Sequence, residues 1–292
     1  MNRIIKAFLF KLKKDLTFRI TLIVGLSVAV LMTLINFLID FSSRDETGIK
    51  FAMCNGQNLL LSSLSPIQNF GLAIPINLIA FTVAEFTQGV IRNKIIAGNS
   101  KRKVYIGLFL SGLIFTFVIM IAYVLLCFAL GSIIGGFDPN GSANTGNIIG
   151  DLIGTKITPE FLIRKLIVTV FIYFSITSFT IMIATLFRNV GLSITITLIV
   201  LLILNIAGMI ILSNGYNAET NSLEGFSKIF AYINPLSTIS FSSITSKTVG
   251  ENTIRVYELS NSLFISNILN NLGFGALWLF AGMEIFNRSD IK

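Results

Sequence analysis

The sequence predicts an all-α membrane protein with six transmembrane helices and with both termini in the cytoplasm. Six long apolar blocks alternate with loops, and each block approaches the roughly 20 residues that a helix needs to cross a bilayer. Hydrophobic residues make up 53% of the chain, charged residues only 12%, and the mean hydropathy is +0.82. A soluble domain is typically about one quarter charged, so a soluble enzyme is a poor interpretation of this composition.

The basic residues fall almost wholly on alternate loops. Residues 1–19, the loop 85–104, Arg188 and the tail from Glu284 hold fourteen Lys/Arg and four Asp/Glu, whereas the remaining loops hold eight Lys/Arg and ten Asp/Glu. Cytoplasmic loops retain Lys and Arg, which places the first set in the cytoplasm. The net charge of +8 is then explained by topology and anionic lipid headgroups, and no nucleic-acid partner is expected.

The chain begins with a predicted amphipathic interfacial helix within residues 1–19. Ile4, Phe8 and Leu12 belong to an apolar series at three- and four-residue spacing, with Lys and Arg interleaved, as in helices that lie in the headgroup plane. The alternative is that this segment continues the first span. That span runs about twenty residues without a small-residue cleavage site, so it is expected to be retained rather than removed as a signal peptide.

Residues 20–292 are expected to form one membrane domain, because no internal repeat is visible. The expected spans lie near residues 20–39, 70–87, 104–134, 161–187, 191–212 and 263–285. The third exceeds the hydrocarbon thickness and must tilt, kink or project beyond it. Only the turn at residues 188–190 separates the fourth and fifth spans, which must therefore be antiparallel neighbours.

Two predicted outer loops have distinct characters. Residues 135–158 are rich in Gly, Asn and Asp and suit a flexible loop, and Gly131 with Gly135 offers a small-xxx-small spacing for helix packing. The segment 226–244 is apolar and contains Pro235. We expect it to form a re-entrant helix-break-helix that dips toward the membrane before the last span, since irregular backbone at membrane depth must be buried in protein or line a cavity. The alternative is an interfacial loop folded over the helix ends.

The residues needed for enzymatic chemistry are nearly missing. The chain has no histidine and two cysteines, Cys54 and Cys127, at different expected depths. It contains no GxxxxGK[ST], no HExxH and no G-x-S-x-G pattern, and a serine without a base is not a nucleophile. No catalytic residue, metal site or bound cofactor is therefore expected.

The most informative motif is the loop E-F-T-Q-G-V-I-R-N-K-I-I-A-G-N-S-K-R-K-V-Y, which begins at Glu85. Its apolar positions suit a short amphipathic helix that Gly98 ends. Glu85 lies at the inner end of the second span, where a buried ionisable group is a functional candidate. It could pair with Arg92 or Lys94, cap the loop helix, or be an ordinary carboxylate at headgroup level.

This loop resembles the connection between the second and third spans of ABC transporter permeases of the type-2 exporter class, which show a Glu, then Gly-Thr-hydrophobic-Arg, then Gly-x-Ser-Arg. The amphipathic start, the six spans, the Asn234-Pro235 pair before the last span and the closing F-N-R-S-D-I-K tail resemble the same family in the same order. Two departures are mild: Val90 stands where Thr is common, and Lys101 where Arg is common.

The resemblance implies a permease that pairs with a separate ABC ATP-binding subunit, which holds ATP and Mg, and with a second permease as a homodimer or heterodimer. A coupling helix would seat in a groove of the ATPase, and the segment around Asn234 and Pro235 would form the outer gate. The residues implied in coupling are Glu85, Gly89, Val90, Ile91, Arg92, Asn93, Lys94 and Gly98. Candidate path-lining residues are Asn36, Asn77, Ser178 and Asn205, which could equally bond between helices.

The expected function is export of an amphipathic substrate, such as an antimicrobial or bacteriocin-like peptide or a drug, across a bacterial cytoplasmic membrane. The sequence does not specify the substrate. The alternative from another class is a non-transporting immunity or scaffold protein that binds a peptide without an ATPase. An intramembrane enzyme is a distant third.

Overall fold

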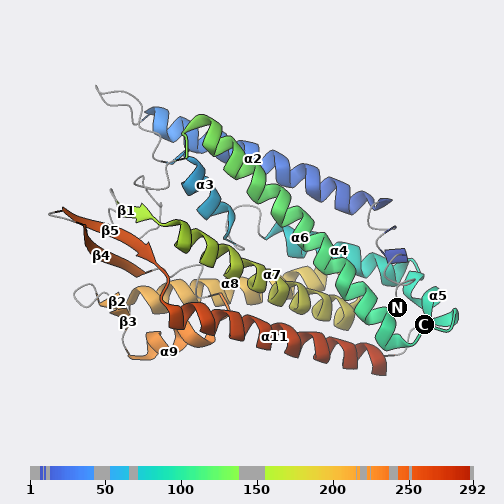
Figure 1. The fold of residues 1–292 in the computed structure, drawn as a ribbon. Helices are drawn as coiled ribbons and strands as arrows, with labels where there is room; N and C mark the ends of the chain where they lie inside the picture. Colours follow the sequence, from blue (N-terminus) through green and yellow to red (C-terminus); the bar gives the residue numbers. More distant parts are fainter. Residues whose placement is uncertain are drawn as a thin grey trace.

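The computed structural model describes residues 7–8, 10, 14–42, 53–65, 72–137, 155–214, 216–217, 222–223, 225–236, 243–249 and 252–289. Long helices dominate this part of the chain, as predicted (Figure 1). They are α2 (Leu16–Ser42), α4 (Ala73–Thr87), α6 (Lys101–Ile134), α7 (Pro159–Phe187), α8 (Val190–Asn214) and α11 (Asn261–Arg288). Three short helices accompany them: α3 (Gly56–Ser63), α5 (Val90–Ile96) and α9 (Gly225–Ile233).

Among the described helices, α2, α6, α7, α8 and α11 are long and apolar enough to cross a membrane. The chain is therefore a multi-pass membrane protein. The predicted second span corresponds to α4, whose 15 residues cover about 22 Å, against a hydrocarbon core of about 30 Å. A sixth span results only when α4 is joined to α5, and the two helices are bent by 50° at the break between them.

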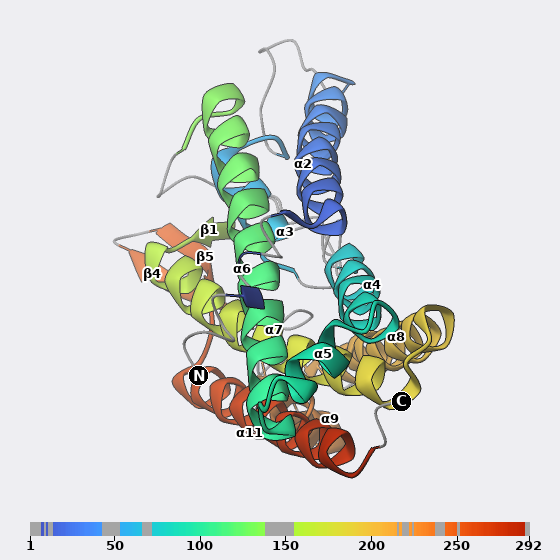
Figure 2. The same ribbon diagram turned by 90° about the vertical axis from the view of Figure 1, so that its right-hand side faces the viewer.

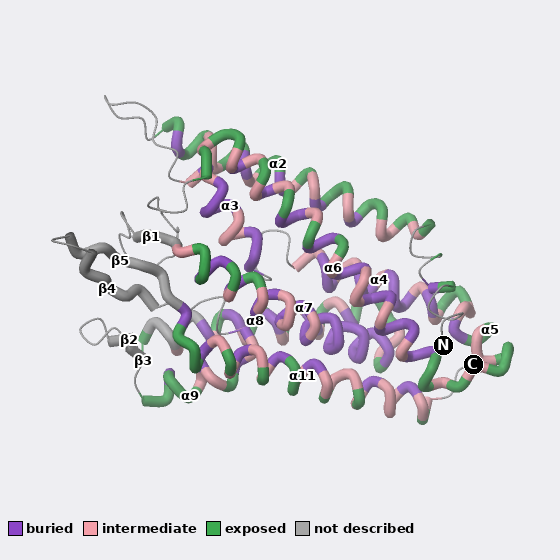
Figure 3. Tube along the Cα trace, viewed as in Figure 1, coloured by how far each residue is buried: buried purple, intermediate pink, exposed green. Residues whose placement is uncertain are grey.

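Helix α7 forms the centre of the bundle. Its residues 175–185 are all buried, and it packs against α4, α6, α8 and α11. Figure 3 shows this burial along α7 and the largely exposed outer face of α2. Helices α2 and α11 lie on opposite sides of the bundle in both views (Figure 1 and Figure 2). A helix that is buried on every side needs uncharged side chains on every side, and residues 175–185 are all apolar, Ser or Thr.

The helix bundle has two ends, which we call the α5 end and the hairpin end. The α5 end comprises α5, the adjoining ends of α4, α6 and α11, and the 188–189 turn. The hairpin end comprises the opposite ends of α6, α7 and α11 with α3, α9 and the strands. Phe18 at the start of α2 packs on Phe115 in the middle of α6, with ring centroids 5.4 Å apart. The first part of α6 therefore extends past the start of α2 toward α5, as its excess length predicts.

Short strands at the hairpin end were not predicted from the sequence. Strands β4 (Ser243–Val249) and β5 (Asn252–Glu258) form an antiparallel hairpin, and β1 (Thr155–Ile157) pairs parallel to β5. Strands β2 (Tyr216–Asn217) and β3 (Ser222–Leu223) form a second, smaller pair. The prediction of an all-α protein therefore holds for the long helices and not for this end.

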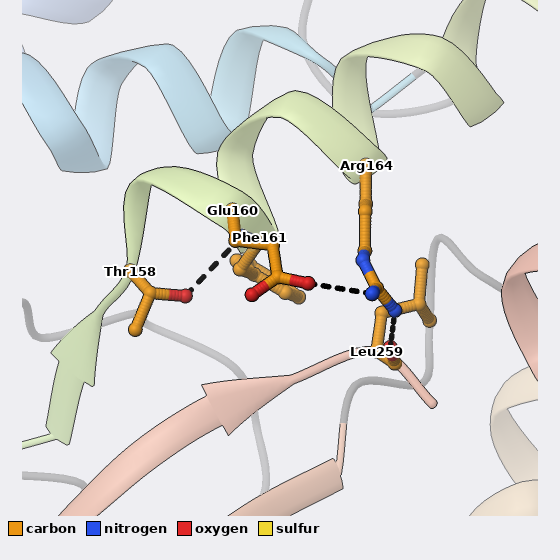
Figure 4. A network of polar contacts seen from close by, with 5 residues as sticks. All are labelled: Thr158, Glu160, Phe161, Arg164 and Leu259. Carbon is orange, nitrogen blue, oxygen red and sulfur yellow. Dashed lines mark hydrogen bonds and ion pairs between the residues drawn. The ribbon is translucent and has the colours of Figure 1, made fainter. Parts of the chain in front are cut away.

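Figure 4 shows how the connection between β5 and α11 is tied to α7. Thr158 caps α7, because its hydroxyl accepts a hydrogen bond from the Phe161 amide at 3.2 Å. Arg164 donates to the Leu259 carbonyl at 2.8 Å and pairs with Glu160 at 2.5 Å. The guanidinium thereby fixes the residue that precedes α11 against the first turns of α7.

The predicted helix-break-helix at 226–244 is only partly right. Helix α9 forms its first half, and a turn at Pro235 and Leu236 supplies the break. Residues 237–242 lie outside the described residues, and Ser243 and Ile244 begin strand β4. The second half therefore does not continue as a helix to residue 244. The β-branched residues of β4 and β5 favour extended backbone.

The loop between the first two spans contains helix α3, which was not predicted. Its first turn lies so close to the end of α6 that a Cβ on Gly131 would stand 2.9 Å from the Asn55 carbonyl oxygen, and one on Gly135 2.1 Å from that of Cys54. The prediction that helix packing uses Gly131 and Gly135 is confirmed. The buried Asp40 carboxylate completes this contact, because it accepts hydrogen bonds from the amides of Met53 and Cys54 at 2.7–3.0 Å.

Candidate functional site

The short loop helix predicted after Glu85 is present as α5. Gly89 precedes it with φ +68° and Gly98 follows it with φ +86°, a backbone region that glycine adopts at little cost. A Cβ at either position would meet no atom within 4 Å. Both glycines are therefore required by backbone conformation rather than by close packing, and they set the direction in which α5 leaves α4 and enters α6.

One face of α5 is held inside the bundle. Ile91 is 1% exposed and belongs to the main hydrophobic core, against which Ile95 also packs. The Lys94 ammonium lies 3.9 Å from a carboxylate oxygen of Glu85 and 2.7 Å from the ring centroid of Phe8. Glu85 is completely buried. Of the two partners predicted for Glu85, the structure therefore selects Lys94, with the aromatic face of Phe8 as a second stabilising group for the ammonium.

Phe8 connects the N-terminal segment to this site. Ala7, Phe8, Phe10 and Lys14 are helical, whereas Ile4 and Leu12 lie outside the described residues. Phe8 is fully buried and Phe10 is 64% exposed. The Phe8 ring packs into the protein core beside Lys94, and the location of this segment in the headgroup plane stays a prediction.

The opposite face of α5 is open. Arg92 and Asn93 are exposed, and Ile96 is 72% exposed. The predicted coupling residues included Ile91 and Lys94 together with Arg92 and Asn93, and did not include Ile96, but the structure divides them between two faces. Ile91 and Lys94 attach α5 to the bundle, whereas Arg92, Asn93 and Ile96 are available to a partner.

The surroundings of the open face are strongly basic. Among the described residues, the α5 end carries seven Lys/Arg and two Glu. The basic residues are Arg92, Lys94, Lys101, Arg102, Lys103, Arg188 and Arg288. Both carboxylates are engaged, Glu85 with Lys94 and Glu284 with Arg288 at 2.6 Å. An exposed isoleucine thus stands on a positively charged surface.

Contacts between α6 and α11 complete this end, and sequence reasoning missed them. Lys101 donates hydrogen bonds to the carbonyls of Asn287 and Ser289, at 3.0 and 2.9 Å. Phe286 is fully buried and packs against Tyr105 and Phe86, with ring centroids 5.7 and 6.0 Å apart. The sequence pattern singled out Lys101 only as standing where Arg is common in the resembling family, and it gave no sign of these partners, which lie more than 180 residues away.

The predicted outer-gate pair forms a turn that follows α9 and contacts the interiors of α8 and α11. The Asn234 side chain donates to the Leu204 carbonyl of α8 at 3.1 Å, and its oxygen accepts from the Leu236 amide at 3.0 Å. Asn271 of α11, which is fully buried, donates to the Pro235 carbonyl at 3.0 Å. The turn is therefore attached to two different long helices.

The four candidate path-lining residues do not form one hydrogen-bonded group in the structure. Asn36, Asn77 and Ser178 each bond to a backbone carbonyl four residues earlier in the same helix. Asn205 is buried on α8, next to the residue that binds Asn234. No hydrogen bond in the described part of the chain connects any two of the four. A hydrogen bond to a carbonyl of the same helix satisfies a polar side chain in a span, so these residues do not need to line a path to be accommodated.

No group of three or more His, Cys, Asp or Glu in the part of the chain that the structure describes could hold a metal ion. Comparison with family models, with curated proteins and with solved structures finds no match for this chain. The candidate site is therefore defined by its own geometry, as a short basic helix fixed on one face and open on the other.

Proposed function

We propose that this chain is the membrane-spanning permease subunit of an ABC exporter, and that a separate ATP-binding subunit docks on the open face of α5. The substrate would be amphipathic, such as an antimicrobial peptide or a drug, and the membrane the bacterial cytoplasmic membrane. The functional unit would contain two permeases and two ATP-binding subunits. Six spans, with both termini and the α5 end in the cytoplasm, and a re-entrant α9 belong to the same proposal.

The observation that carries the proposal is that α5 has one face buried against the bundle and one face exposed. Its inner face is held by the buried Ile91 and by the Lys94 contacts with Glu85 and Phe8. Its outer face presents Arg92, Asn93 and a 72% exposed Ile96. A helix that only closed a loop would need the inner face alone. Because the inner face is attached to the bundle, a force applied to the outer face would be passed to α4, to α6 and, through Phe8, to the N-terminal segment.

The charge distribution supports the orientation. The excess of Lys and Arg at the α5 end favours the cytoplasmic side, where ATP is available to a partner. The proposed re-entrant α9 is supported by its inverted pattern, since the small residues Ser227 and Ala231 are buried while Phe226, Ile229 and Ile233 are 57–67% exposed. Large apolar side chains on an outer face suit lipid and are unfavourable in water.

Co-purification with a candidate ABC ATP-binding subunit from the same organism tests the proposal. We expect the wild-type chain to retain that subunit, and Arg92→Glu combined with Ile96→Asp to lose it, because both changes fall on exposed side chains. Lys228→Glu, an equally exposed charge reversal on α9, is the matched control and should leave the complex intact. Failure of the wild-type chain to bind any ATP-binding subunit would instead support the non-transporting immunity or scaffold protein.

A further inference from the structure

Helix α11 is held at the α5 end by a cation from another span. The last carbonyls of a helix have no partners within the helix, and a basic group is favourable there. Lys101 supplies that group, with hydrogen bonds to the Asn287 and Ser289 carbonyls at 3.0 and 2.9 Å. Since Lys101 is the first residue of α6, three residues after Gly98, the end of α11 is attached almost directly to α5.

A second contact fixes α11 one turn further in. Tyr105 is completely buried, and a Cβ on Gly282 would lie 2.0 Å from its hydroxyl oxygen. The Tyr105 ring also packs on Phe286. The start of α6 and the end of α11 therefore have complementary surfaces, and this packing leaves little room for one helix to slide along the other.

The same helix holds the Asn234–Pro235 turn at the hairpin end. Asn271 donates to the Pro235 carbonyl at 3.0 Å, while Leu236, which follows in the turn, is 2% exposed. Residues 271 and 287 are separated by about 24 Å along the helix axis. Helix α11 is continuous over its 28 residues, so an axial shift of the helix at residue 287 is transmitted to residue 271.

We propose that Lys101 is a positioning residue that couples α5 to the Asn234–Pro235 turn through α11. Displacement of α5 moves Lys101, Lys101 moves the end of α11, and Asn271 then pulls on the Pro235 carbonyl. The role of this linkage in transport rests on the proposed function, but the linkage itself is a property of this chain alone. Contiguity between two sites is not coupling until both are shown to bias the same element, so the test measures the turn directly.

A cysteine at position 236 reports opening of the turn, because Leu236 belongs to the turn and its side chain is buried. The chain in lipid nanodiscs carries Leu236→Cys and is labelled with a maleimide, and the same chain without that change gives the background from the buried Cys54 and Cys127. We expect Lys101→Met, which removes both hydrogen bonds and keeps the apolar stem, to raise the labelling rate at 236 about fivefold, the low end of ordinary allosteric coupling.

Three comparisons separate the linkage from a general loss of structure. Lys101→Arg retains a donor and should restore slow labelling. Lys103→Met removes an exposed charge from the same turn of α6 and should match the wild type. Labelling of Cys54 and Cys127 should stay at background. An unchanged rate at 236 in Lys101→Met, an equal rise in Lys103→Met, or faster labelling of Cys54 and Cys127 in parallel would each overturn the proposal.

Addition of the ATP-binding subunit distinguishes this proposal from the proposed function. ATP should change the labelling rate at 236 in the wild-type chain, and Lys101→Met should abolish that change while complex formation and ATP hydrolysis persist. A change that persists in Lys101→Met would refute the linkage. If no ATP-binding subunit binds, the proposed function fails, and the measurement on the chain alone still decides whether Lys101 controls the turn.

Discussion

Substitution of Gly135 by alanine tests the contact between the end of α6 and the segment before α3. The added Cβ would lie 2.1 Å from the Cys54 carbonyl oxygen and 2.9 Å from the Asn55 Cα. Both distances are shorter than ordinary van der Waals contact, which begins near ~3.5 Å, and the first is shorter by more than ~1 Å. Both are backbone atoms, so no side-chain rotation relieves the overlap. Movement of residue 54 would also disturb the Cys54 amide, which donates to Asp40 at 2.7 Å.

Overpacking of this kind costs about 1 to 3 kcal/mol, which for a chain of this size corresponds to a fall in apparent Tm of roughly 2 to 5 °C. The assay is thermal unfolding in detergent with a dye that fluoresces on reaction with thiols, because Cys54 and Cys127 are both buried and free. Gly273→Ala is the matched control, since a Cβ there meets no atom within 4 Å and alanine favours a helix by up to about 1 kcal/mol.

We expect Gly135→Ala to unfold at a lower temperature than the wild type and Gly273→Ala to unfold at the same or a higher temperature. Equal unfolding temperatures for the two variants would refute the reasoning, because the same chemical change would then have the same effect in open space and against backbone. Earlier reaction of Cys54 than of Cys127 in Gly135→Ala would further locate the disturbance.

Three other predictions follow from the described contacts. Glu85→Gln removes the buried partner of Lys94 and should cost about 1 to 3 kcal/mol of stability and lower ATP-coupled transport, whereas Glu160→Gln breaks an exposed pair and should cost under about 1 kcal/mol; equal losses in thermal unfolding would contradict the assignment. A membrane-impermeant maleimide added outside whole cells should label Glu160→Cys and not Arg102→Cys, and the reverse pattern would invert the proposed orientation. Burial, with the neighbouring Asp40 carboxylate second, raises the pKa of Cys54 from 9.0 to about 11. Its protonated form therefore stabilises the fold fully below pH 9, and this contribution is lost as the pH rises toward 11. Alkylation of the native protein should accelerate between pH 9 and 11, and a rate that levels off near pH 9 would contradict the raised pKa.

The sequence predicted the long helices well because apolar runs at the helical period are a local signal. The ends of α6 at Lys101 and Ile134 and the end of α7 at Phe187 match the expected spans within three residues. The α5 helix was also predictable, since Gly89 and Gly98 bracket its amphipathic pattern. In each case the information lies within one segment of the chain.

Contacts between distant segments were beyond reach of the sequence alone. Nothing local indicates that Lys101 bonds to carbonyls of α11, or that Asp40 holds the amides of Met53 and Cys54. The strands β4 and β5 were missed because the apolar segment before them suggested that a helix continued to residue 244. The two faces of α5 were not separated either, since Ile91 and Ile96 are chemically alike and only burial distinguishes them.

A photo-crosslinking amino acid at position 96 tests the central claim most directly. In cells that also produce the candidate ATP-binding subunit, the account predicts a crosslink to that subunit from position 96 on the open face of α5. It predicts none from position 229, which is equally apolar and 57% exposed but lies on α9 at the hairpin end. A crosslink from position 229 in place of position 96, or from neither position while the permease is folded in the membrane, would contradict it.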